Sequence, residues 1–552
     1  MTRRGRDAVL DVLRSEGVTH VFGNPGSTEL PLMDALADAP DLTYVLGLQE
    51  ATVVAMAEGY ARATGRPAFL NLHTSAGVGN AVGALTNARA DGAPLVVTAG
   101  QQDYRHIVTD PLLSGDLVGL ARATTKWAHE VRSLDELGTV LRRAFHDAMV
   151  PPRGPVFVSL PMNFLDEEGN APVPAPSRFE RGAVAGGLDG LAGLLAGTDP
   201  SLLAIVAGDE VAEHGGVASL VELAEALGCA VYANPLVGSV VFPTTHPLYR
   251  GALAPFAGVI NSTLSPFERV LVVGDQPFRT YPYTPGPPVP ASVELFHLAA
   301  DAHQLGRTYA VAYGAAGDLR ASLSALVALV APRADGRRAT AELDAARARA
   351  ADARSKLDRA ALAAYDQVPM APNAMAHALF AALPDDAVVV DEAITTGGPI
   401  RSFHRAEAPG SWHFCRGGGL GWGMPAAVGM SLGLDRSPVV CVVGDGSAMY
   451  SPQALWTAAH LDVPVLFVVV NNRQYLILKN FLRRMEGDSV RTGRMVGMDL
   501  DAPAVDYVSL ARSMGVGASR VERAVDVGDA VRAAYGSEKP YLLELPIATP
   551  SR

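Results

Sequence analysis

Residues 441–478 read CVVGDGSAMYSPQALWTAAHLDVPVLFVVVNNRQYLIL, and this stretch predicts how the rest of the chain folds. Two apolar runs, residues 439–443 and 463–470, have the uniform hydrophobicity of parallel strands that are buried on both faces. Between them, apolar side chains recur at helical spacing, which predicts a connecting helix. Consecutive parallel strands joined by one helix end at the same edge of the sheet, where open α/β sheets bind ligands.

Polar residues follow each of these two predicted strands. The first strand leads into Gly444-Asp445-Gly446-Ser447, and the second leads into Asn472. One carboxylate, one amide oxygen and a nearby backbone carbonyl form a set of hard oxygen ligands that leaves positions open for water and phosphate, as Mg²⁺ prefers. The two glycines allow the backbone to approach a diphosphate closely. The alternative is an ordinary strand–turn–helix in which Asp445 caps the helix.

The composition describes a compact globular protein of several domains. The chain has 552 residues, of which 49% are hydrophobic and 18% charged, and this length is too great for a single core. The formal net charge of −12, without a block of lysine or arginine, argues against nucleic-acid and anionic-membrane partners. Three cysteines without a CxxC pair favour a reducing, cytoplasmic location, and we expect neither a signal peptide nor a membrane span.

Alternating strands and helices along the chain predict an α/β protein with three doubly wound parallel-sheet domains. We place these domains at residues 1–180, 181–335 and 369–552, with a solvated helical linker rich in alanine, arginine and aspartate at residues 336–368. The middle domain has no GxGxxG motif after its strands. A structural spacer is therefore favoured over a dinucleotide-binding site in that domain.

Three residues of the first domain carry chemistry close to the ends of predicted strands. Glu50 begins a long helix, Ser27 follows a glycine at a strand-to-helix turn, and His73 ends a strand before a run of small residues. Free N–H groups and a hydroxyl at such a turn can bind an anion, and an exposed imidazole can titrate near neutral pH. The alternatives are helix capping by Glu50 or Ser27 and a structural role for His73.

The GDGS…NN pattern resembles the signature of thiamine-diphosphate enzymes. Within that family, the chain resembles the benzoylformate decarboxylase group over nearly its whole length. The segments GNPGSTELP, HTSAGVGNAVGALTNA, FCRGGGLGWGMPAA and GDGSAMYSPQALWTAA stand in the same order in both. The resemblance implies a pyrimidine-binding first domain, a central Rossmann-like domain and a diphosphate-binding third domain. It also implies thiamine diphosphate and Mg²⁺ as cofactors, with the organic cofactor supplying the reactive centre.

The resemblance also implies roles for individual residues. Glu50 is expected to hydrogen-bond the pyrimidine ring, and Ser27 is expected to bind the substrate carboxylate. His73 and Tyr281 complete the implied catalytic set. The implied cofactor contacts are Gly418 through its carbonyl, Leu420 from beneath the cofactor, and Glu50, Asn80, Thr395, Asp445, Gly446, Ser447, Asn472 and Tyr475. The implied Mg²⁺ ligands are Asp445, Asn472 and the carbonyl of Gln474, and the implied substrate pocket consists of Ser27, His73, Ile394, Leu476, Ile477, Leu478 and Phe481.

The sequence departs from the decarboxylase pattern around the substrate. The segment FRTYPYTPG places Tyr281 where the decarboxylases have a second histidine, the alternative being that Tyr281 points away as a packing residue. Ile394 replaces a hydroxyl residue. Leu476, Ile477 and Leu478 stand where the decarboxylases have two small residues before a leucine. The pocket is therefore expected to be more apolar and more filled near the cofactor.

These features together predict the non-oxidative decarboxylation of a 2-keto acid to an aldehyde, with a benzoylformate-like aromatic or bulky apolar substrate and with carboligase activity. The alternative is an acyloin-type C–C lyase or ligase with weak decarboxylase activity, because loss of the second histidine removes a proton donor. A third hypothesis is a protein that binds the cofactor without turnover, and the presence of Glu50, Ser27 and His73 together argues against it. The resemblance implies active sites that are shared between two chains, in a homodimer or a homotetramer.

Overall fold

The computed structural model describes residues 2–177, 182–274 and 276–549 and divides into two compact units. The large unit consists of residues 1–178, 364–401 and 415–552. The central unit consists of residues 179–363 and 402–414. The predicted boundary between residues 180 and 181 lies outside the described residues. The other predicted domain boundaries stay predictions.

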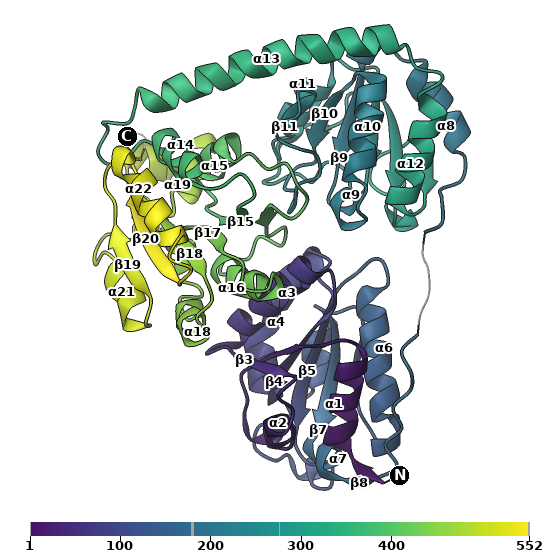
Figure 1. The fold of residues 1–552 in the computed structure, drawn as a ribbon, viewed down its shortest axis with the longest axis vertical. Coiled ribbons are helices and arrows are strands. Elements are labelled where there is room, and N and C mark those ends of the chain that lie inside the picture. Colours follow the sequence, from purple (N-terminus) through teal and green to yellow (C-terminus); the bar gives the residue numbers. More distant parts are fainter. Residues whose placement is uncertain (1, 178–181, 275, 550–552) are drawn as a thin grey trace. The chain divides into compact units, whose positions relative to one another are not determined.

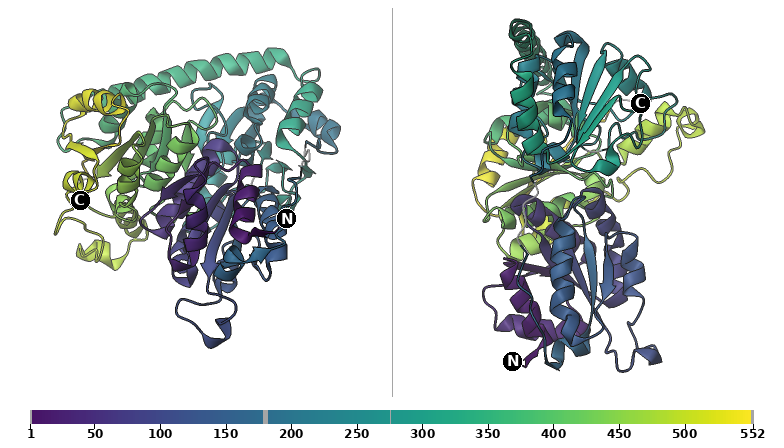
Figure 2. Two further views of the ribbon diagram at one scale, coloured as in Figure 1. Left: turned by 60° about the horizontal axis from the view of Figure 1, so that its bottom comes forward. Right: turned by 90° about the vertical axis from the view of Figure 1, so that its right-hand side faces the viewer.

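Residues 2–177 of the large unit form a doubly wound module, the N-terminal module, around a six-stranded parallel sheet. In sheet order, its strands are β3 (Thr43–Leu46), β2 (His20–Gly23), β4 (Ala68–His73), β5 (Leu95–Gln101), β7 (Val156–Pro161) and β6 (Ala128–Glu130). Its helices are α1 (Gly5–Ser15), α2 (Leu30–Ala37), α3 (Glu50–Thr64), α4 (Thr74–Ala90), α5 (Leu117–Arg122), α6 (Leu137–Met149) and α7 (Met162–Asp166). Figures 1 and 2 show helices on both faces of this sheet, which explains why β5 and β7 are buried along their whole length. A short antiparallel pair, β1 (Arg3–Arg4) and β8 (Glu168–Gly169), lies beside it.

The rest of the large unit is a second doubly wound module, the C-terminal module. In sheet order, its parallel strands are β15 (Val388–Glu392), β17 (Val439–Gly444), β18 (Val465–Asn471), β20 (Tyr541–Pro546) and β19 (Gly517–Arg520). Its helices are α14 (Pro372–Ala382), α15 (Gly397–Phe403), α16 (Gly423–Gly433), α17 (Asp445–Ala448), α18 (Ala454–His460), α19 (Leu476–Arg484), α20 (Asp488–Thr492), α21 (Tyr507–Ser513) and α22 (Ala524–Tyr535). The two apolar runs of the opening stretch are β17 and β18, which pair in parallel register.

The central unit contains a third parallel sheet. In sheet order, its strands are β11 (Tyr249–Ala252), β10 (Ala230–Ala233), β9 (Leu203–Ala207), β12 (Arg269–Val273), β13 (Glu294–Ala299) and β14 (Tyr313–Ala316). Its other elements are α8 (Leu188–Ala196), α9 (Glu210–Glu213), α10 (Val217–Leu227), α11 (Ala257–Leu264), α12 (Leu319–Val330), the long helix α13 (Gly336–Leu362) and β16 (Trp412–Phe414). After β9, the Asp209 carboxylate accepts hydrogen bonds from the Gly238 N–H and the Ser239 hydroxyl, so this acidic residue binds a loop of its own unit.

The predicted fold class is confirmed, because the chain consists of three parallel-sheet α/β domains. Uniformly apolar strands identified the parallel sheets, since such strands are stable only when helices cover both faces. Among the described residues, no helix combines the length and the apolar character that a membrane crossing requires.

Helices α3 and α16 join the two modules of the large unit backbone against backbone. A Cβ on Gly59 of α3 would lie 2.0 Å from the carbonyl oxygen of Ala426. Likewise, a Cβ on Gly429 of α16 would lie 1.8 Å from the carbonyl oxygen of Met56. Any side chain at either position would force the helices apart. Gly59 and Gly429 therefore determine how closely the N-terminal and C-terminal modules can approach each other.

Candidate active site

Asp445 lies where β17 ends, at the carboxyl edge of the C-terminal sheet. It is the first residue of α17 and only 3% exposed, and the N-cap position belongs to Gly444, so Asp445 does not cap the helix. Its Oδ1 accepts a hydrogen bond of 2.9 Å from the Gly446 N–H, whereas its Oδ2 is buried and has no hydrogen-bond partner among the described residues. A buried carboxylate oxygen without a partner is costly unless a cation binds it.

The turn after β18 lies beside this carboxylate. Asn472 begins the turn, and its Oδ1 accepts a 3.0 Å hydrogen bond from the Gln474 N–H. Burial raises the pKa of Asp445 to about 6, and the backbone N–H groups of Gly446 and of the turn at Arg473, Gln474 and Asn472 partly oppose that rise. Asp445 and Asn472 therefore converge at one edge, as the strand pattern predicted.

The surroundings of Asp445 fit a divalent cation and a diphosphate. The unpartnered Oδ2, the Asn472 amide and the Gln474 carbonyl are hard oxygen donors of the kind Mg²⁺ takes. A Cβ on Gly446 would lie 2.4 Å from the Tyr475 ring, so only glycine fits at this turn after β17. The Tyr507 hydroxyl donates to the Asp445 carbonyl at 2.8 Å and fixes the backbone of the turn.

Glu50 lies at the carboxyl edge of the N-terminal sheet. The helix α3 begins at Glu50, but its cap is Gln49, whose side chain accepts from the Thr52 N–H at 3.1 Å. Glu50 is 9% exposed, and its carboxylate accepts a 3.1 Å hydrogen bond from the Asn80 amide of α4. Capping therefore does not explain Glu50, and its carboxylate faces α4.

His73 ends β4 and stands close to Glu50. A Cβ on Gly77 would lie 3.3 Å from Glu50 Oε1 and 3.6 Å from His73 Cβ, so the two side chains flank one turn of α4. The Nδ1 of His73 lies 2.8 Å from Oε2 of Glu29, which is 1% exposed. Because a carboxylate only accepts hydrogen bonds, we assign the proton to Nδ1, and Nε2 is then free to accept. Thr74, the next residue, has a φ of 44°, a strained backbone of the kind that clusters at functional sites.

Glu29 is a residue of this candidate site that the sequence reasoning missed. Besides His73, its carboxylate accepts from the Gly26 N–H, the Gly100 N–H and the Thr28 hydroxyl, each at 2.8 Å. These donors satisfy both oxygens of the buried carboxylate. The spacing of Gly26 and Glu29 is that of a capping box, and this local signal could have identified the residue. Ser27 begins the same short 3₁₀ turn with an exposed side chain.

The loop at residues 416–422 carries Gly418 and Leu420, both predicted to contact the cofactor. Glu392, the last residue of β15, binds the end of this loop. Its carboxylate accepts from the N–H groups of Gly421, Trp422 and Gly423 at 2.8, 3.1 and 2.9 Å, the last being the first residue of α16. Glu392 is a second residue that sequence reasoning left without a role, although it lies at the end of a strand, beside the position that Asp445 takes after β17.

The remaining predicted residues lie on three segments. Thr395 and Ile394 follow β15, and Ile394 is exposed. The predicted pocket residues of α19 are the buried Leu476, the partly buried Ile477 and Phe481, and the exposed Leu478. Tyr281 belongs to the central unit, where its N–H donates to the Pro255 carbonyl at 2.8 Å and its side chain is 60% exposed. The roles of these residues stay predictions.

Three family descriptions match the chain in order. They are "Thiamine pyrophosphate enzyme, N-terminal TPP binding domain" at residues 3–122, "Thiamine pyrophosphate enzyme, central domain" at residues 199–326 and "Thiamine pyrophosphate enzyme, C-terminal TPP binding domain" at residues 397–545. The two cofactor-binding descriptions cover the modules that carry Glu50 and Asp445.

Individual relatives match over nearly the full length. A benzoylformate decarboxylase of Pseudomonas aeruginosa is 35% identical, with 98% of each chain covered. An acetolactate synthase isozyme 3 large subunit of Escherichia coli is 28% identical, with 93% of this chain and 88% of that one covered. Among solved structures, a thiamine diphosphate-dependent 4-hydroxybenzoylformate decarboxylase of Rhodococcus jostii has a TM-score of 0.86 at 31% identity, with 100% of each chain covered. A benzoylformate decarboxylase of Polynucleobacter necessarius has a TM-score of 0.88 at 28% identity, with 99% of each chain covered.

Asp445→Ala should abolish Mg²⁺-dependent retention of thiamine diphosphate, because it removes the only charged ligand of the predicted metal set. We expect the dissociation constant to rise by about 100-fold or more, measured by titration calorimetry with Mg²⁺ in excess. Asp462→Ala is the matched control, since it removes an exposed carboxylate of the same module. Equal affinities in the two variants would rule out Asp445 as a ligand.

Glu392→Gln should remove a pH dependence of stability. Burial raises the pKa of Glu392 from 4.5 to about 7 in the folded chain, although the three N–H donors oppose the rise. The stabilising contribution of this group is therefore complete below the unfolded pKa and is lost as the pH rises through about 7.

Thermal unfolding midpoints give the measurement. Between about pH 5 and pH 8, the stability of the wild type should fall relative to that of Glu392→Gln by on the order of 1–3 kcal/mol. Parallel pH profiles for the two proteins would show that Glu392 does not titrate in this range.

Proposed function

Because the chain belongs to the thiamine pyrophosphate enzyme family, we propose that it is a non-oxidative decarboxylase of 2-keto acids, with Mg²⁺ beside thiamine diphosphate. The proposed substrates are benzoylformate-like, with an aromatic or bulky apolar group on the keto carbon, and the proposed product is the aldehyde. Carboligation is proposed as a side activity.

One observation supports the decarboxylase assignment most directly. His73 and Glu50 flank the same turn of α4, and the buried Glu29 fixes the imidazole through Nδ1. Release of CO₂ and formation of an aldehyde require a proton donor close to the reacting carbon. An imidazole held in one orientation by Glu29 can take up a proton at Nε2 and then deliver it, which meets that requirement.

Each residue then has a defined task. When bound, thiamine diphosphate supplies the electron sink that allows CO₂ to leave from a 2-keto acid. Glu50, oriented by Asn80, would hydrogen-bond the pyrimidine ring. Asp445, Asn472 and the Gln474 carbonyl would hold Mg²⁺ against the diphosphate.

The substrate would be oriented by the N-terminal module. The exposed hydroxyl of Ser27 is available to donate to the substrate carboxylate, next to the turn that holds Glu29. The Nε2 atom of His73 would hold and deliver the proton. The apolar side chains of Ile394 and Ile477 would exclude water from the reacting carbon.

The alternative is an acyloin-type lyase or ligase with weak decarboxylase activity. Tyr281 supports it, because a phenol is a poorer acid–base group at neutral pH than the imidazole that it replaces. The acetolactate synthase relative shows that this sequence family also includes enzymes named as synthases.

The deciding experiment is a product analysis. Purified chain with thiamine diphosphate and Mg²⁺ would receive benzoylformate, pyruvate or an acyloin, and CO₂, aldehyde and acyloin would be measured. The proposal predicts one CO₂ for each benzaldehyde unit, counted as free aldehyde or within acyloin, with free benzaldehyde as the main product and with faster turnover of benzoylformate than of pyruvate. Interconversion of aldehydes and acyloins without CO₂ would favour the alternative, and cofactor binding without any turnover would contradict both.

We further propose that the active protein is a homodimer or homotetramer in which each site takes Glu50 from one chain and Asp445 from its partner. A reducing, cytoplasmic location is also proposed. The three cysteines, Cys229, Cys415 and Cys441, are buried and unpaired, which accords with it.

Glu50→Gln should separate catalysis from binding. The amide keeps the size of the side chain but loses the charge that is proposed to act on the pyrimidine ring. We expect turnover of benzoylformate to fall by on the order of 10²-fold or more, while the affinity for thiamine diphosphate changes by no more than a few-fold. Turnover equal to that of the wild type would remove Glu50 from the mechanism.

Tyr281→His should restore a second imidazole to the proposed substrate pocket. We expect decarboxylation to become faster and the share of acyloin among the products to fall, because a titratable donor is added. Tyr283→His is the matched control, since Tyr283 is 87% exposed on the same loop. If both variants behave as the wild type, Tyr281 is a packing residue without a role in the reaction.

A further inference from the structure

Side chains of the large unit hydrogen-bond the loop at residues 416–422 at its start, its middle and its end. In the proposed function, Gly418 and Leu420 of this loop meet the cofactor, so its shape decides how the cofactor is held. Glu392 binds its end from within the C-terminal module. Asn87 of α4 binds its middle and Asp91, the C-cap residue of that helix, binds its start, and neither has a role in the predicted site.

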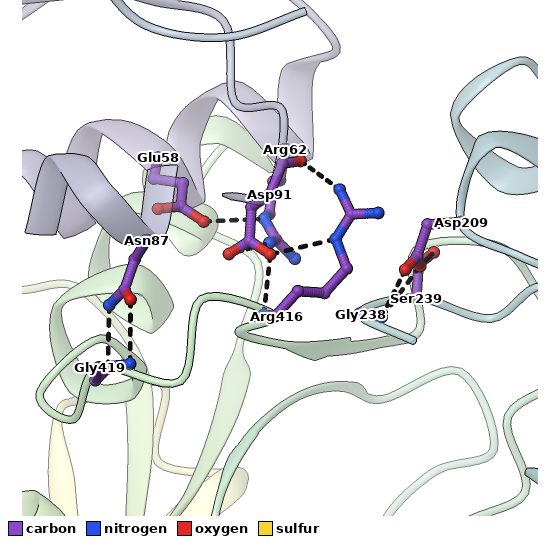
Figure 3. Close-up of polar contacts among 9 residues, drawn as sticks. All are labelled: Glu58, Arg62, Asn87, Asp91, Asp209, Gly238, Ser239, Arg416 and Gly419. Atoms are coloured by element: carbon purple, nitrogen blue, oxygen red, sulfur yellow. Dashed lines mark hydrogen bonds and ion pairs between the residues drawn. The ribbon is translucent and has the colours of Figure 1, made fainter. Parts of the chain in front are cut away.

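Asn87 binds the middle of the loop through both ends of its amide. Its Nδ2 donates to the Gly419 carbonyl at 2.9 Å, and its Oδ1 accepts from the Gly419 N–H at 3.0 Å. Figure 3 shows both hydrogen bonds. Together they satisfy the backbone N–H and C=O of Gly419, as a neighbouring β-strand would. Asn87 is only 5% exposed, so no water replaces either bond at low cost.

Two glycines of the loop make the contact possible. A Cβ on Gly417 would lie 2.4 Å from Asn87 Oδ1 and 2.5 Å from its Cα, and a Cβ on Gly419 would lie 2.8 Å from Oδ1. The intervening Gly418 has a φ of +75°, which a residue with a side chain rarely adopts. The loop is therefore shaped to fit around Asn87, and its backbone bends at Gly418.

Asp91 binds the start of the loop through buried charge. It accepts from the Arg416 N–H at 2.8 Å, and its carboxylate lies 2.7 Å from the Arg62 guanidinium. Burial alone would raise the pKa of Asp91, but the charges of Arg62 and Arg416 bring it below its usual value. Burial and the neighbouring Asp91 raise the pKa of Glu58 well above its usual value. Figure 3 shows these four side chains close to the Asn87 contact.

We propose that Asn87 is a positioning residue for the cofactor, which acts by fixing Gly419 between the two residues that meet it. This inference rests on the proposed function of Gly418 and Leu420. The joining of the two modules does not depend on Asn87, because α3 and α16 already pack backbone against backbone at Gly59 and Gly429. The task left to Asn87 is to hold one loop conformation.

The test compares Asn87→Ala with Thr86→Ala, an exposed neighbour on the same helix whose hydroxyl bonds only within α4. Three quantities are measured: the affinity for thiamine diphosphate with Mg²⁺ present, hydrogen exchange of the loop amides without cofactor, and kcat and KM for the 2-keto acid. For Asn87→Ala we expect about tenfold weaker cofactor binding, about tenfold faster exchange at residues 417–421 and a lower kcat. KM should stay within about twofold, because the substrate contacts lie elsewhere, and Thr86→Ala should match the wild type.

Gly419→Ala attacks the same contact from the other side, since its Cβ would displace the Asn87 amide. It serves if Asn87→Ala does not fold, and it should weaken cofactor binding to a similar degree. Wild-type cofactor affinity and loop exchange in either folded variant would overturn the inference. Absence of cofactor binding by the wild type itself would instead overturn the proposed function, so the two failures are distinguishable.

Discussion

The close crossing of α3 and α16 is the constraint on which the large unit depends. At Gly59 and Gly429 the two helices leave no room for a Cβ, so the N-terminal and C-terminal modules have a fixed separation. This crossing also places α4 beside the loop that precedes α16, where Asn87 reaches Gly419. Because packed interiors resist even one added methyl group, a side chain at either glycine would shift the loop as well as the helices.

The buried carboxylates of the large unit differ in whether hydrogen-bond donors of the protein satisfy both of their oxygens. Both oxygens of Glu29 and both of Glu392 are satisfied by N–H or hydroxyl donors of their own module. These residues hold His73 and the loop before α16 in place. Asp445 differs, because its Oδ2 is buried without a hydrogen-bond partner among the described residues. Within the described part of the chain, Oδ2 of Asp391 and Oε2 of Glu58 have no hydrogen-bond partner either, but those carboxylates are ion-paired with Arg401 and Arg62, whereas the charge of Asp445 would be balanced by the proposed Mg²⁺.

The sequence was sufficient for features that depend on local pattern. Apolar runs predicted β17 and β18 and brought Asp445 and Asn472 to one edge, and a helix start after a strand predicted the position of Glu50. The contact of Asn87 with Gly419 could not be foreseen, because it joins residues 332 apart and leaves no periodic signal. Glu29 lay between these extremes, since its capping-box spacing is local but its bond to His73 is not.

In the proposed assembly, two sheet edges, one with Glu50 and one with Asp445, build one cofactor site from two chains. Co-expression of Glu50→Gln and Asp445→Ala chains with different tags, followed by purification of the mixed dimer, tests it most directly. If the edges come from different chains, one of the two sites contains both native residues, and the mixed dimer should recover about half of the wild-type activity. If both residues of one chain serve the same site, every site in the mixed dimer is damaged, and activity no higher than that of the single variants would contradict the claim.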